Sequence, residues 1–201
     1  MTADFREYAP AAARNREPIL AVLAEHLPDE GLVLEIAAGT GEHAAFLSTR
    51  LGGRDWQPTE ADPARLASID AHAAADGATG VRRALVLDVT ASQWPVDQVG
   101  AILNCNMIHI APWQVCLGLM AGAGRVLQPG GKLFMYGPYR RDGAHTAPSN
   151  EAFDASLRAR DASWGIRDLE QVVEAAEAQG LELDRVIAMP ANNLTVIYRK
   201  I

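Results

Sequence analysis

The sequence predicts an α/β fold, in which a Rossmann-like, seven-stranded and mostly parallel sheet carries helices on both faces and ends in an antiparallel strand pair. Two observations predict it. Apolar strand-like runs alternate with helical patterns of about a dozen residues, which is typical of a parallel sheet wrapped on both faces. The last two strands, 181–189 and 193–200, are joined by a connection too short for a parallel crossover, so they must run antiparallel.

The first elements are a helix, a strand, a glycine turn and a second helix. Residues 10–27 are expected to be helical because a proline stands near their start and apolar side chains recur three or four residues apart. Residues 32–37 form an apolar strand, which leads into a turn built from Gly39 and Gly41. The following helix, about 42–51, is expected to end at Gly52-Gly53.

A second strand and a third helix follow. Residues 55–60 have strand character, although Pro58 in their interior favours an irregular or poorly paired strand. The alanine-rich segment 63–76 is predicted to be helical, with Asp62 as its cap and Pro63 in its first turn.

The middle of the chain supplies the centre of the sheet. Residues 83–89 are expected to form a third strand, and the unbroken apolar run 100–106 a fourth strand in the middle of the sheet. A helix over about 113–127 follows. The turn residues Pro129-Gly130-Gly131 then lead into a fifth strand, 132–136.

The segment 137–167 departs from this alternation because it is polar and rich in Arg, Asp, Pro and Ser. A short helix is expected near 150–160, and another over about 168–179 before Gly180. The 201 residues are expected to form one domain, with residues 1–30 as an N-terminal helical cap and 137–167 inserted on the substrate side.

Composition narrows the class of protein. With 49% apolar residues, 21% charged residues and a net charge of -7, the chain is typical of a globular protein and lacks the basic face of a nucleic-acid binder. No segment approaches the ~18 apolar residues of a membrane span, and acids stand where a signal peptide carries basic residues, so the cytoplasm is expected. Cys105 and Cys116 are expected to be buried thiols, and no cluster predicts a metal site.

The candidate binding residues follow the predicted strands. In open α/β sheets ligands lie at the carboxyl ends of the strands. The Gly39 and Gly41 turn follows the first strand, and Glu60 follows the second about 20 residues later, the spacing of a carboxylate that accepts ribose hydroxyls. Asp88 after the third strand is placed to accept a hydrogen bond from an adenine amine. Asn104 lies near the end of the fourth strand.

Two classes of nucleotide-bearing ligand fit a glycine turn. The spacing Gly39-x-Gly41-x-x-Ala44 also fits a dinucleotide site, but Glu35, four residues before the turn, would repel a pyrophosphate. No Tyr-x-x-x-Lys pair is present, since Tyr136 is followed by Arg140. A cationic sulfonium cofactor reverses the first objection, because carboxylates attract a ligand with positive charge.

The motifs Glu35-x-x-x-Gly39-x-Gly41, an acid after strand two, Asp88 after strand three and Leu127-x-Pro129-Gly130-Gly131 together resemble the class I S-adenosylmethionine-dependent methyltransferases. A narrower resemblance links the chain to the domain of unknown function 938 family, the methyltransferase-like 26 relatives. It rests on five motifs: Ala11-Ala12-x-Arg14-Asn15-x-x-Pro18-Ile19, Trp56-Gln57-Pro58, Asn106-Met107-x-His109-Ile110-x-Pro112-Trp113, Tyr136-Gly137-Pro138-Tyr139 and Pro190-Ala191-Asn192-Asn193. The resemblance implies the fold and S-adenosylmethionine as cofactor, but no substrate. Position 60 is Glu where the family pattern leads us to expect Asp.

Glu35 is expected to bind the amino-acid end of the cofactor directly or through the amides of the turn, although it can equally cap the turn. Glu60 and Asp88 share this alternative role as caps. Arg14 and Asn15, on the N-terminal helix, are placed to hold the carboxylate of the cofactor, as an Arg–carboxylate pair does; a solvated helix face is the alternative.

His109 is the main catalytic candidate, because a neutral imidazole after the central strand can take a proton from the acceptor. A structural, hydrogen-bonded histidine is the alternative. Asn106 is placed to orient the substrate.

The candidate substrate-binding residues belong to the last third of the chain, and they are Tyr139, Arg140, Asn192 and Asn193. Arginines on this rim suggest an anionic acceptor. Pairing with nearby acids, and ordinary turn formation by the two asparagines, are the alternatives.

The expected function is in-line transfer of the sulfonium methyl to a small-molecule acceptor whose reacting atom is open between O, N and S. Alternatives are a non-catalytic S-adenosylmethionine-binding module and, less favoured, a nicotinamide oxidoreductase. The Asn/Asp-Pro-Pro-Tyr signature of enzymes that methylate nucleic-acid amines is absent from the sequence, in agreement with its acidic charge.

Overall fold

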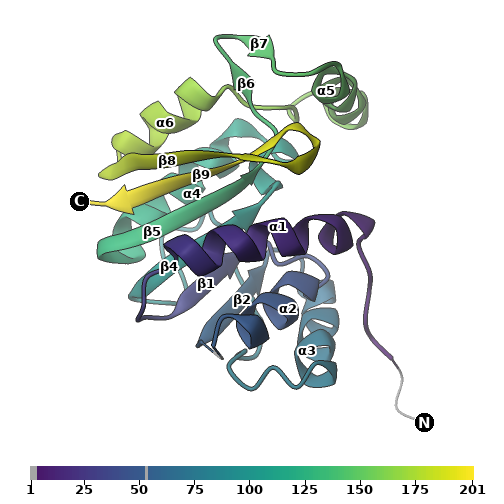
Figure 1. Ribbon diagram of the computed structural model, residues 1–201, viewed down its shortest axis with the longest axis vertical. Helices are drawn as coiled ribbons and strands as arrows, with labels where there is room; N and C mark the ends of the chain where they lie inside the picture. Colours follow the sequence, from purple (N-terminus) through teal and green to yellow (C-terminus); the bar gives the residue numbers. More distant parts are fainter. Residues whose placement is uncertain (1–3, 53) are drawn as a thin grey trace.

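The structure, a computed structural model, describes residues 4–52 and 54–201; Gly53, the second glycine expected to end a helix, lies outside the described residues. Seven strands form one sheet in the order β3-β2-β1-β4-β5-β9-β8 (Figure 1). Their bounds are β1 Val33–Ile36, β2 Trp56–Glu60, β3 Leu85–Val86, β4 Val99–Cys105, β5 Leu127–Gly137, β8 Leu181–Met189 and β9 Asn193–Lys200. The predicted fold class is confirmed.

The direction of the strands follows from the length of their connections. Strands β1 to β5 pair in parallel, and a helix or a long crossover separates each from the next. In this sheet β9 pairs antiparallel with both β5 and β8. The β8–β9 pair is antiparallel because the three-residue turn η3 (Pro190–Asn192) joins the two strands directly. Ala191 and Asn192 adopt positive φ angles in this turn, of 56° and 57°.

Helices cover both faces of the sheet, with α1 and α2 on one face and α4 and α6 on the other (Figure 1). Their bounds are α1 Pro10–His26, α2 Glu42–Arg50, α3 Leu66–Ala75, α4 Trp113–Val126, α5 Pro148–Arg160 and α6 Leu169–Glu177, with short 3₁₀ turns η1 Pro63–Arg65 and η2 Met107–His109. Asp62 accepts a hydrogen bond from the Ala64 N–H at 3.0 Å, as predicted for a capping residue.

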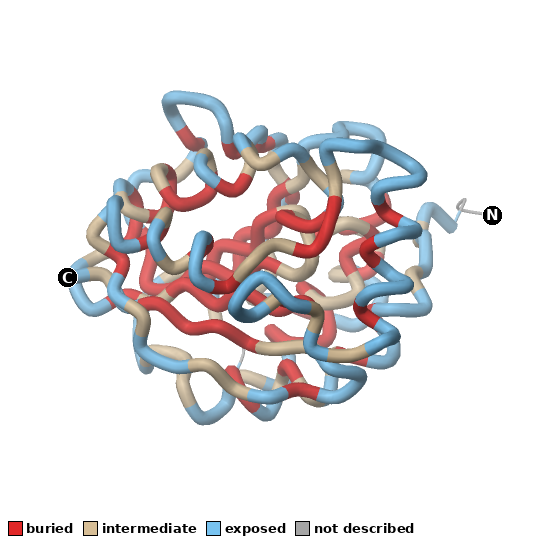
Figure 2. Tube along the Cα trace, turned by 90° about the horizontal axis from the view of Figure 1, so that it is seen from above, coloured by how far each residue is buried: buried red, intermediate tan, exposed pale blue. Residues whose placement is uncertain are grey.

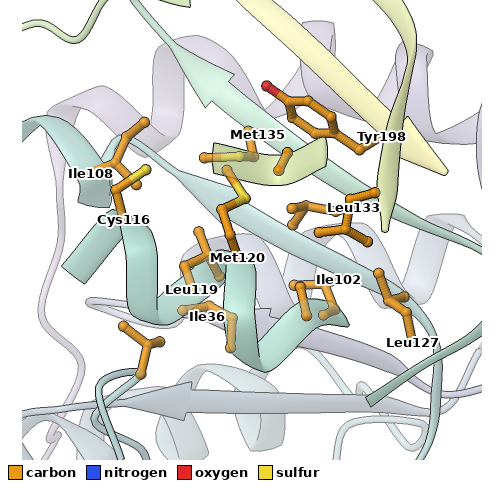
Figure 3. Close-up of a cluster of buried hydrophobic side chains, with 14 of the residues drawn as sticks. Ile36, Ile102, Ile108, Cys116, Leu119, Met120, Leu127, Leu133, Met135 and Tyr198 are labelled. Carbon is orange, nitrogen blue, oxygen red and sulfur yellow. The ribbon is translucent and has the colours of Figure 1, made fainter. Parts of the chain in front are cut away.

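Alternating side chains of the strands divide the core into two parts. Leu34 and Ile36 of β1 pack toward α4 and α6, where Figure 3 shows apolar side chains of α4 interleaved with those of the sheet. Val33 packs toward α1 and α2. Buried residues accordingly run along the strands in the interior, with exposed loops around them (Figure 2). Because strand side chains alternate, Glu35 also belongs to the α1 face.

Several elements differ from the prediction. Strand β5 begins at Leu127 rather than at 132, so the segment Pro129-Gly130-Gly131 lies within it. Strand β2 pairs with both β1 and β3, and Pro58 lies opposite Glu35, so the poorly paired strand expected from Pro58 is not observed.

The third strand is only Leu85–Val86, rather than 83–89, because it is an edge strand and the Ala84 N–H is held by the Asp70 carboxylate at 2.8 Å. A small hairpin, β6 (Arg140–Arg141) and β7 (Ala144–His145), lies in the segment expected to be irregular. Its turn residues Asp142 and Gly143 have φ angles of 50° and 73°, the tight-turn conformation that the Asp-Gly pair favours.

Three general findings complete the description. Cys105 and Cys116 are free thiols, and Cys116 is fully buried. Within residues 4–52 and 54–201 no three His, Cys, Asp or Glu side chains are grouped to hold a metal ion. No helix in the same part of the chain has the length and apolarity to cross a bilayer.

Candidate functional site

The candidate site lies at one edge of the sheet, where the parallel strands β1, β2, β4 and β5 all end. The loops that leave these strands carry most of the residues selected from the sequence. The N-terminal end of α1 reaches the same edge, at the right of Figure 1. The topology therefore brings segments far apart in sequence to one place, as expected for an open α/β sheet.

The two glycines of the turn after β1 serve different purposes. Gly41 has a φ of +94°, and a Cβ atom there would lie 2.4 Å from the Ile69 Cα atom of α3. Its lack of a side chain is therefore required by packing. Gly39 has a φ of +59°, and the only described atom within 4 Å of a Cβ placed there is a guanidinium nitrogen of Arg65, at 3.9 Å. Open space in front of the turn lies at Gly39 and not at Gly41.

Glu60 connects the turn after β1 to the loop after β2. One of its carboxylate oxygens accepts a hydrogen bond from the Gly39 N–H at 2.9 Å. The other accepts from the Ala61 and Asp62 N–H groups at 2.9 and 3.2 Å. Because each carboxylate oxygen offers two lone pairs, Glu60 can hold both loops and still accept a further hydrogen bond.

Glu35 lies beneath the turn rather than on its open side. It is 2% exposed, and its carboxylate accepts a hydrogen bond at 2.7 Å from the indole N–H of Trp56, which is itself fully buried. Burial raises the pKa of Glu35 to about 8; the Trp56 hydrogen bond opposes this rise and the neighbouring Glu60 charge contributes to it. At neutral pH the buried carboxyl group is therefore largely protonated when no cation lies near it.

Asp88 and Asn104 both make local structural hydrogen bonds. Asp88 is exposed and accepts from the Thr90 N–H and hydroxyl at 2.9 and 2.7 Å, which lowers the pKa of the carboxyl group. Asn104 is 1% exposed, and its amide N–H donates to the Ile36 carbonyl at 3.1 Å. Asn104 thus links β4 to β1 and does not present its amide N–H to solvent.

The N-terminal half of α1 covers the end of β5. Asn15 is buried, and its side-chain oxygen lies 2.7 Å from the His43 Nε2 atom. Burial lowers the pKa of His43 to about 4, so this imidazole is neutral at pH 7. Arg14 is exposed. Burial raises the pKa of Tyr136, whereas the Asn15 side chain and the Arg14 charge lower it. Sequence reasoning did not select Tyr136.

His109 and Asn106 meet over Gly137. Asn106 has a φ of 63°, and His109 follows in η2 with no exposed surface. A Cβ atom on Gly137 would lie 2.6 Å from the His109 Nε2 atom and 3.3 Å from the Asn106 Oδ1 atom. The absence of a side chain at Gly137 therefore allows the imidazole and the amide to approach the same point.

The environment of His109 does not agree with its expected role as a base. Its Nδ1 atom accepts the Arg167 backbone N–H at 3.4 Å, and its carbonyl accepts the Gly165 N–H at 2.9 Å. Its ring packs edge-on against Tyr139 at 5.1 Å. Burial, together with the Arg167 charge, lowers the pKa of His109 to about 3. This imidazole is neutral at physiological pH and a poor proton acceptor.

The expected substrate-binding residues are largely engaged elsewhere. Tyr139 does not cover the substrate side: it is 1% exposed and packs in the core shared with α4 and α6. The Arg140 Nε atom lies 3.4 Å from an Asp168 carboxylate oxygen. Arg140 is therefore paired with a nearby acid, which is the alternative considered for it above. Asn192 donates to the Ser149 hydroxyl at 3.1 Å. Asn193 bonds the turn carbonyls before it.

Asp154 and Arg167, which sequence reasoning missed, hold the loop around His109. Asp154 on α5 is buried and accepts from the Ile166 N–H at 2.6 Å and from the Arg158 Nε–H at 2.9 Å. The Arg167 guanidinium donates to the Ile108 carbonyl at 2.9 Å. Only the Asp154-x-x-x-Arg158 spacing, a helical ion pair, signals this network in the sequence.

Asp154→Ala is expected to lower the free energy of unfolding by about 2–3 kcal/mol at pH 7, because the Ile166 N–H is left buried without a partner. Burial tends to raise the pKa of Asp154, but the Arg158 and Ile166 hydrogen bonds outweigh it and lower the pKa. This contribution is present above pH 4 and is lost as the pH falls through the lowered pKa. Urea titrations at pH 7 and at pH 3 measure both effects.

Glu151→Ala, which removes an exposed carboxylate from the same helix, is the control and should change stability by less than about 1 kcal/mol. Equal effects of the two substitutions would contradict the role given to Asp154.

Two surface grooves lie away from this edge. One runs beside the end of α3, between Asp70 and Arg83. The other lies between α4 and α6, lined by Trp113, Leu117 and Glu174 among others. Neither groove is lined by Gly39, Gly41, Asn106, His109 or Gly137. The candidate site is therefore assigned from the side chains at the strand ends and not from these grooves.

Comparisons with known proteins agree with this geometry. A family model described as "Protein of unknown function (DUF938)" matches residues 6–200. An O-methyltransferase family protein from Burkholderia thailandensis shares the fold with a TM-score of 0.81 at 14% identity, over 94% of this chain and 57% of that one. Human N-acetylserotonin methyltransferase in complex with SAM gives a TM-score of 0.78 at 12% identity, over 94% and 52% of the two chains.

This chain covers a larger share of a third structure. Geranyl diphosphate C-methyltransferase from Streptomyces coelicolor, in complex with Mg²⁺, geranyl diphosphate and S-adenosyl-L-homocysteine, gives a TM-score of 0.75 at 12% identity, over 94% of this chain and 80% of that one. The chain spans little more than half the length of the first two structures. At these identities the likeness establishes a common fold.

Proposed function

The chain belongs to the DUF938 family, and we propose that it binds S-adenosylmethionine at the carboxyl edge of its sheet and transfers the methyl group to a small-molecule acceptor. The observation that carries the proposal is the turn after β1. It leaves open space at Gly39, and the carboxyl groups of Glu60 and Glu35 lie beside and beneath it. Two carboxyl groups around an open backbone suit a cationic adenosyl ligand better than an anionic diphosphate.

The proposed cofactor contacts follow the order of the strands. Gly39 allows the ligand to approach the backbone, and Glu60 accepts a ribose hydroxyl with its remaining lone pair. Asp88 accepts a hydrogen bond from the adenine amine. Glu35 acts from below the turn through its charge, and Asn104 holds the strands that carry the turn.

The open end of α1 completes the proposed cofactor site. Arg14 is exposed and free to pair with the carboxylate of the amino-acid moiety. Asn15 is bound to His43 and fixes the position of the helix beside Tyr136. Removal of Arg14 should therefore weaken binding without changing the fold.

The proposed reaction is an in-line displacement. When bound, S-adenosylmethionine supplies a methyl group that is already activated by its sulfonium. The protein then has to align the acceptor and exclude water. Asn106 and His109, at the end of β4, are the residues that we propose lie beside the acceptor and position it. Arg140 is not assigned to the acceptor, because it is paired with Asp168.

A non-catalytic binding module is the second candidate, favoured by the burial of His109. Transfer of label from methyl-labelled S-adenosylmethionine to a metabolite extract separates the two functions, since a module gives no labelled product. A nicotinamide oxidoreductase, the less favoured alternative, predicts a thermal shift with NADH that S-adenosylmethionine does not reproduce.

The binding test uses two glycines with the same backbone conformation. Gly39 and Gly77 have φ angles of +59° and +62°, and neither faces described atoms closer than 3.9 Å. Alanine at either position should lower stability by about 1 kcal/mol through backbone strain alone. Calorimetry should show that Gly39→Ala weakens binding of S-adenosylmethionine at least about tenfold, whereas Gly77→Ala leaves it unchanged. Equal binding by both variants would contradict the proposed site.

A further inference from the structure

His109 contains a polar atom whose burial requires an explanation. Its Nε2 atom is buried and has no hydrogen-bond partner among the described residues. Buried polar atoms in folded proteins nearly always have partners, so an unpaired one indicates an interaction that completes the site. The His109 Nε2 atom lies beside Gly137, where a Cβ atom would come within 2.6 Å of it, so the ring nitrogen takes up the place that a side chain would need.

The contacts of the ring determine which nitrogen carries the proton. A neutral imidazole has one N–H donor and one acceptor nitrogen. The Nδ1 atom accepts the backbone N–H of Arg167 at 3.4 Å, so the hydrogen is on Nε2. The charged groups that act on the ring, the Arg167 guanidinium and the Asp154 carboxylate, have opposite effects on its protonation, with Arg167 the stronger. His109 therefore offers a hydrogen-bond donor, its Nε2–H group, beside Gly137.

Asn106 provides the matching acceptor. Its Oδ1 atom and the His109 Nε2 atom are both among the three nearest described atoms to a Cβ built on Gly137. Asn106 is partly exposed, and its side chain makes no hydrogen bond among the described residues that fixes its amide plane. The two atoms lie 3.3 Å and 2.6 Å from the same built Cβ position, so the amide oxygen and the ring nitrogen are neighbours.

We propose that His109 is a positioning residue, whose Nε2–H donates to the Asn106 Oδ1 atom and so directs the Asn106 NH₂ group toward the acceptor. This inference rests on the proposed methyl transfer and names the class of its acceptor. An NH₂ group donates hydrogen bonds to a lone pair, and the inferred acceptor is one that presents such a lone pair on the reacting oxygen itself, a carboxylate or a phenolate. The acceptor oxygen forms the bond to carbon with its own lone pair, the carbon–sulfur bond breaks and its electron pair stays on sulfur. No proton is transferred in this step, and no base is required.

The positioning role is tested on the free protein by NMR of the full chain labelled with ¹⁵N-histidine. The expected result is an Nε2–H tautomer of His109 that does not titrate between pH 5 and pH 8, with a slowly exchanging Hε2 signal. This signal should disappear in Asn106→Gly, which keeps the φ of 63° without strain, and should return in Asn106→Asp, which restores an oxygen at the same place. His109→Gln identifies the resonance.

A His109 ring that titrates in this range, an Nδ1–H tautomer, or an Hε2 signal unchanged in Asn106→Gly would overturn the assignment. None of these measurements requires a cofactor, so their failure is separate from failure of the proposed function.

The acceptor class is tested with products of label transfer from methyl-labelled S-adenosylmethionine to a metabolite extract. Methyl esters or aryl methyl ethers are expected, and a label on nitrogen or carbon would overturn the oxygen-acceptor class. Complete absence of labelled product would count against the methyl transfer itself and also against this acceptor class.

Discussion

Gly41→Val is expected to lower the free energy of unfolding by about 2–5 kcal/mol and to reduce the folded fraction at 37 °C. Two terms add. A β-branched residue at a φ of +94° carries backbone strain of about 1–2 kcal/mol, and overpacking adds about 1–3 kcal/mol because the new Cβ atom would lie 2.4 Å from the Ile69 Cα atom. Backbone atoms of α3 cannot move aside as a flexible side chain can. Urea denaturation followed by circular dichroism measures the change.

The matched control is Gly52→Val. Gly52 has a similar φ of +82°, but no described atom lies within 4 Å of a Cβ placed there. Its substitution should lower stability by the strain alone, about 1–2 kcal/mol. If the two variants are equally stable, α3 does not pack against the turn as the structure shows. Loss of cofactor binding in Gly41→Val is accordingly no evidence for a binding site, whereas Gly39→Ala can supply it.

The different purposes of the two glycines illustrate what the sequence can predict. The strand, the glycine turn and the helix were predicted because the apolar run, the glycines and the helical spacing all lie within a dozen residues. The contact that requires Gly41 comes from Ile69, on a different helix. Local spacing therefore predicts the turn but cannot state which glycine faces the ligand.

The same limit explains the residues whose roles changed. Tyr139 and His109 stand at the ends of strands, where exposure was expected, but the loop held by Arg167 and Asp154 covers them. That network joins the end of β4 to residues more than 40 positions later. By contrast β8 and β9 agree with their predicted bounds, because their pairing is determined by a turn of three residues.

Glu35→Gln is expected to stabilise the free protein and to weaken its binding of S-adenosylmethionine. The pKa of Glu35 is raised to about 8 in the folded chain from 4.5 in the unfolded chain. The folded state therefore binds the proton more tightly, and stability falls as the pH rises from 4.5 to 8, by about 3–5 kcal/mol in all. Glutamine can still accept the Trp56 hydrogen bond and carries no charge to desolvate.

Urea titrations should therefore show Glu35→Gln more stable than the natural chain by about 2–4 kcal/mol at pH 8, with little difference at pH 4.5. Glu17→Gln, at an exposed position of α1, should change neither value. A difference between natural chain and Glu35→Gln that does not depend on pH would show that the buried carboxyl group stays ionised in the folded state.

Glu35→Gln should bind S-adenosylmethionine more weakly than the natural chain, although it is the more stable protein when free. The reason is that a cationic ligand above the turn favours the ionised carboxylate. At pH 7 the natural chain should release close to one proton when S-adenosylmethionine binds, seen as a binding enthalpy that varies with the ionisation enthalpy of the buffer. Glu35→Gln should release none and bind at least about tenfold more weakly. A buried acid that stabilises a cationic ligand lowers the stability of the free protein once it is ionised. Near the pKa of Glu35, the same ionisation therefore lowers the stability of the free protein and raises its affinity for the ligand.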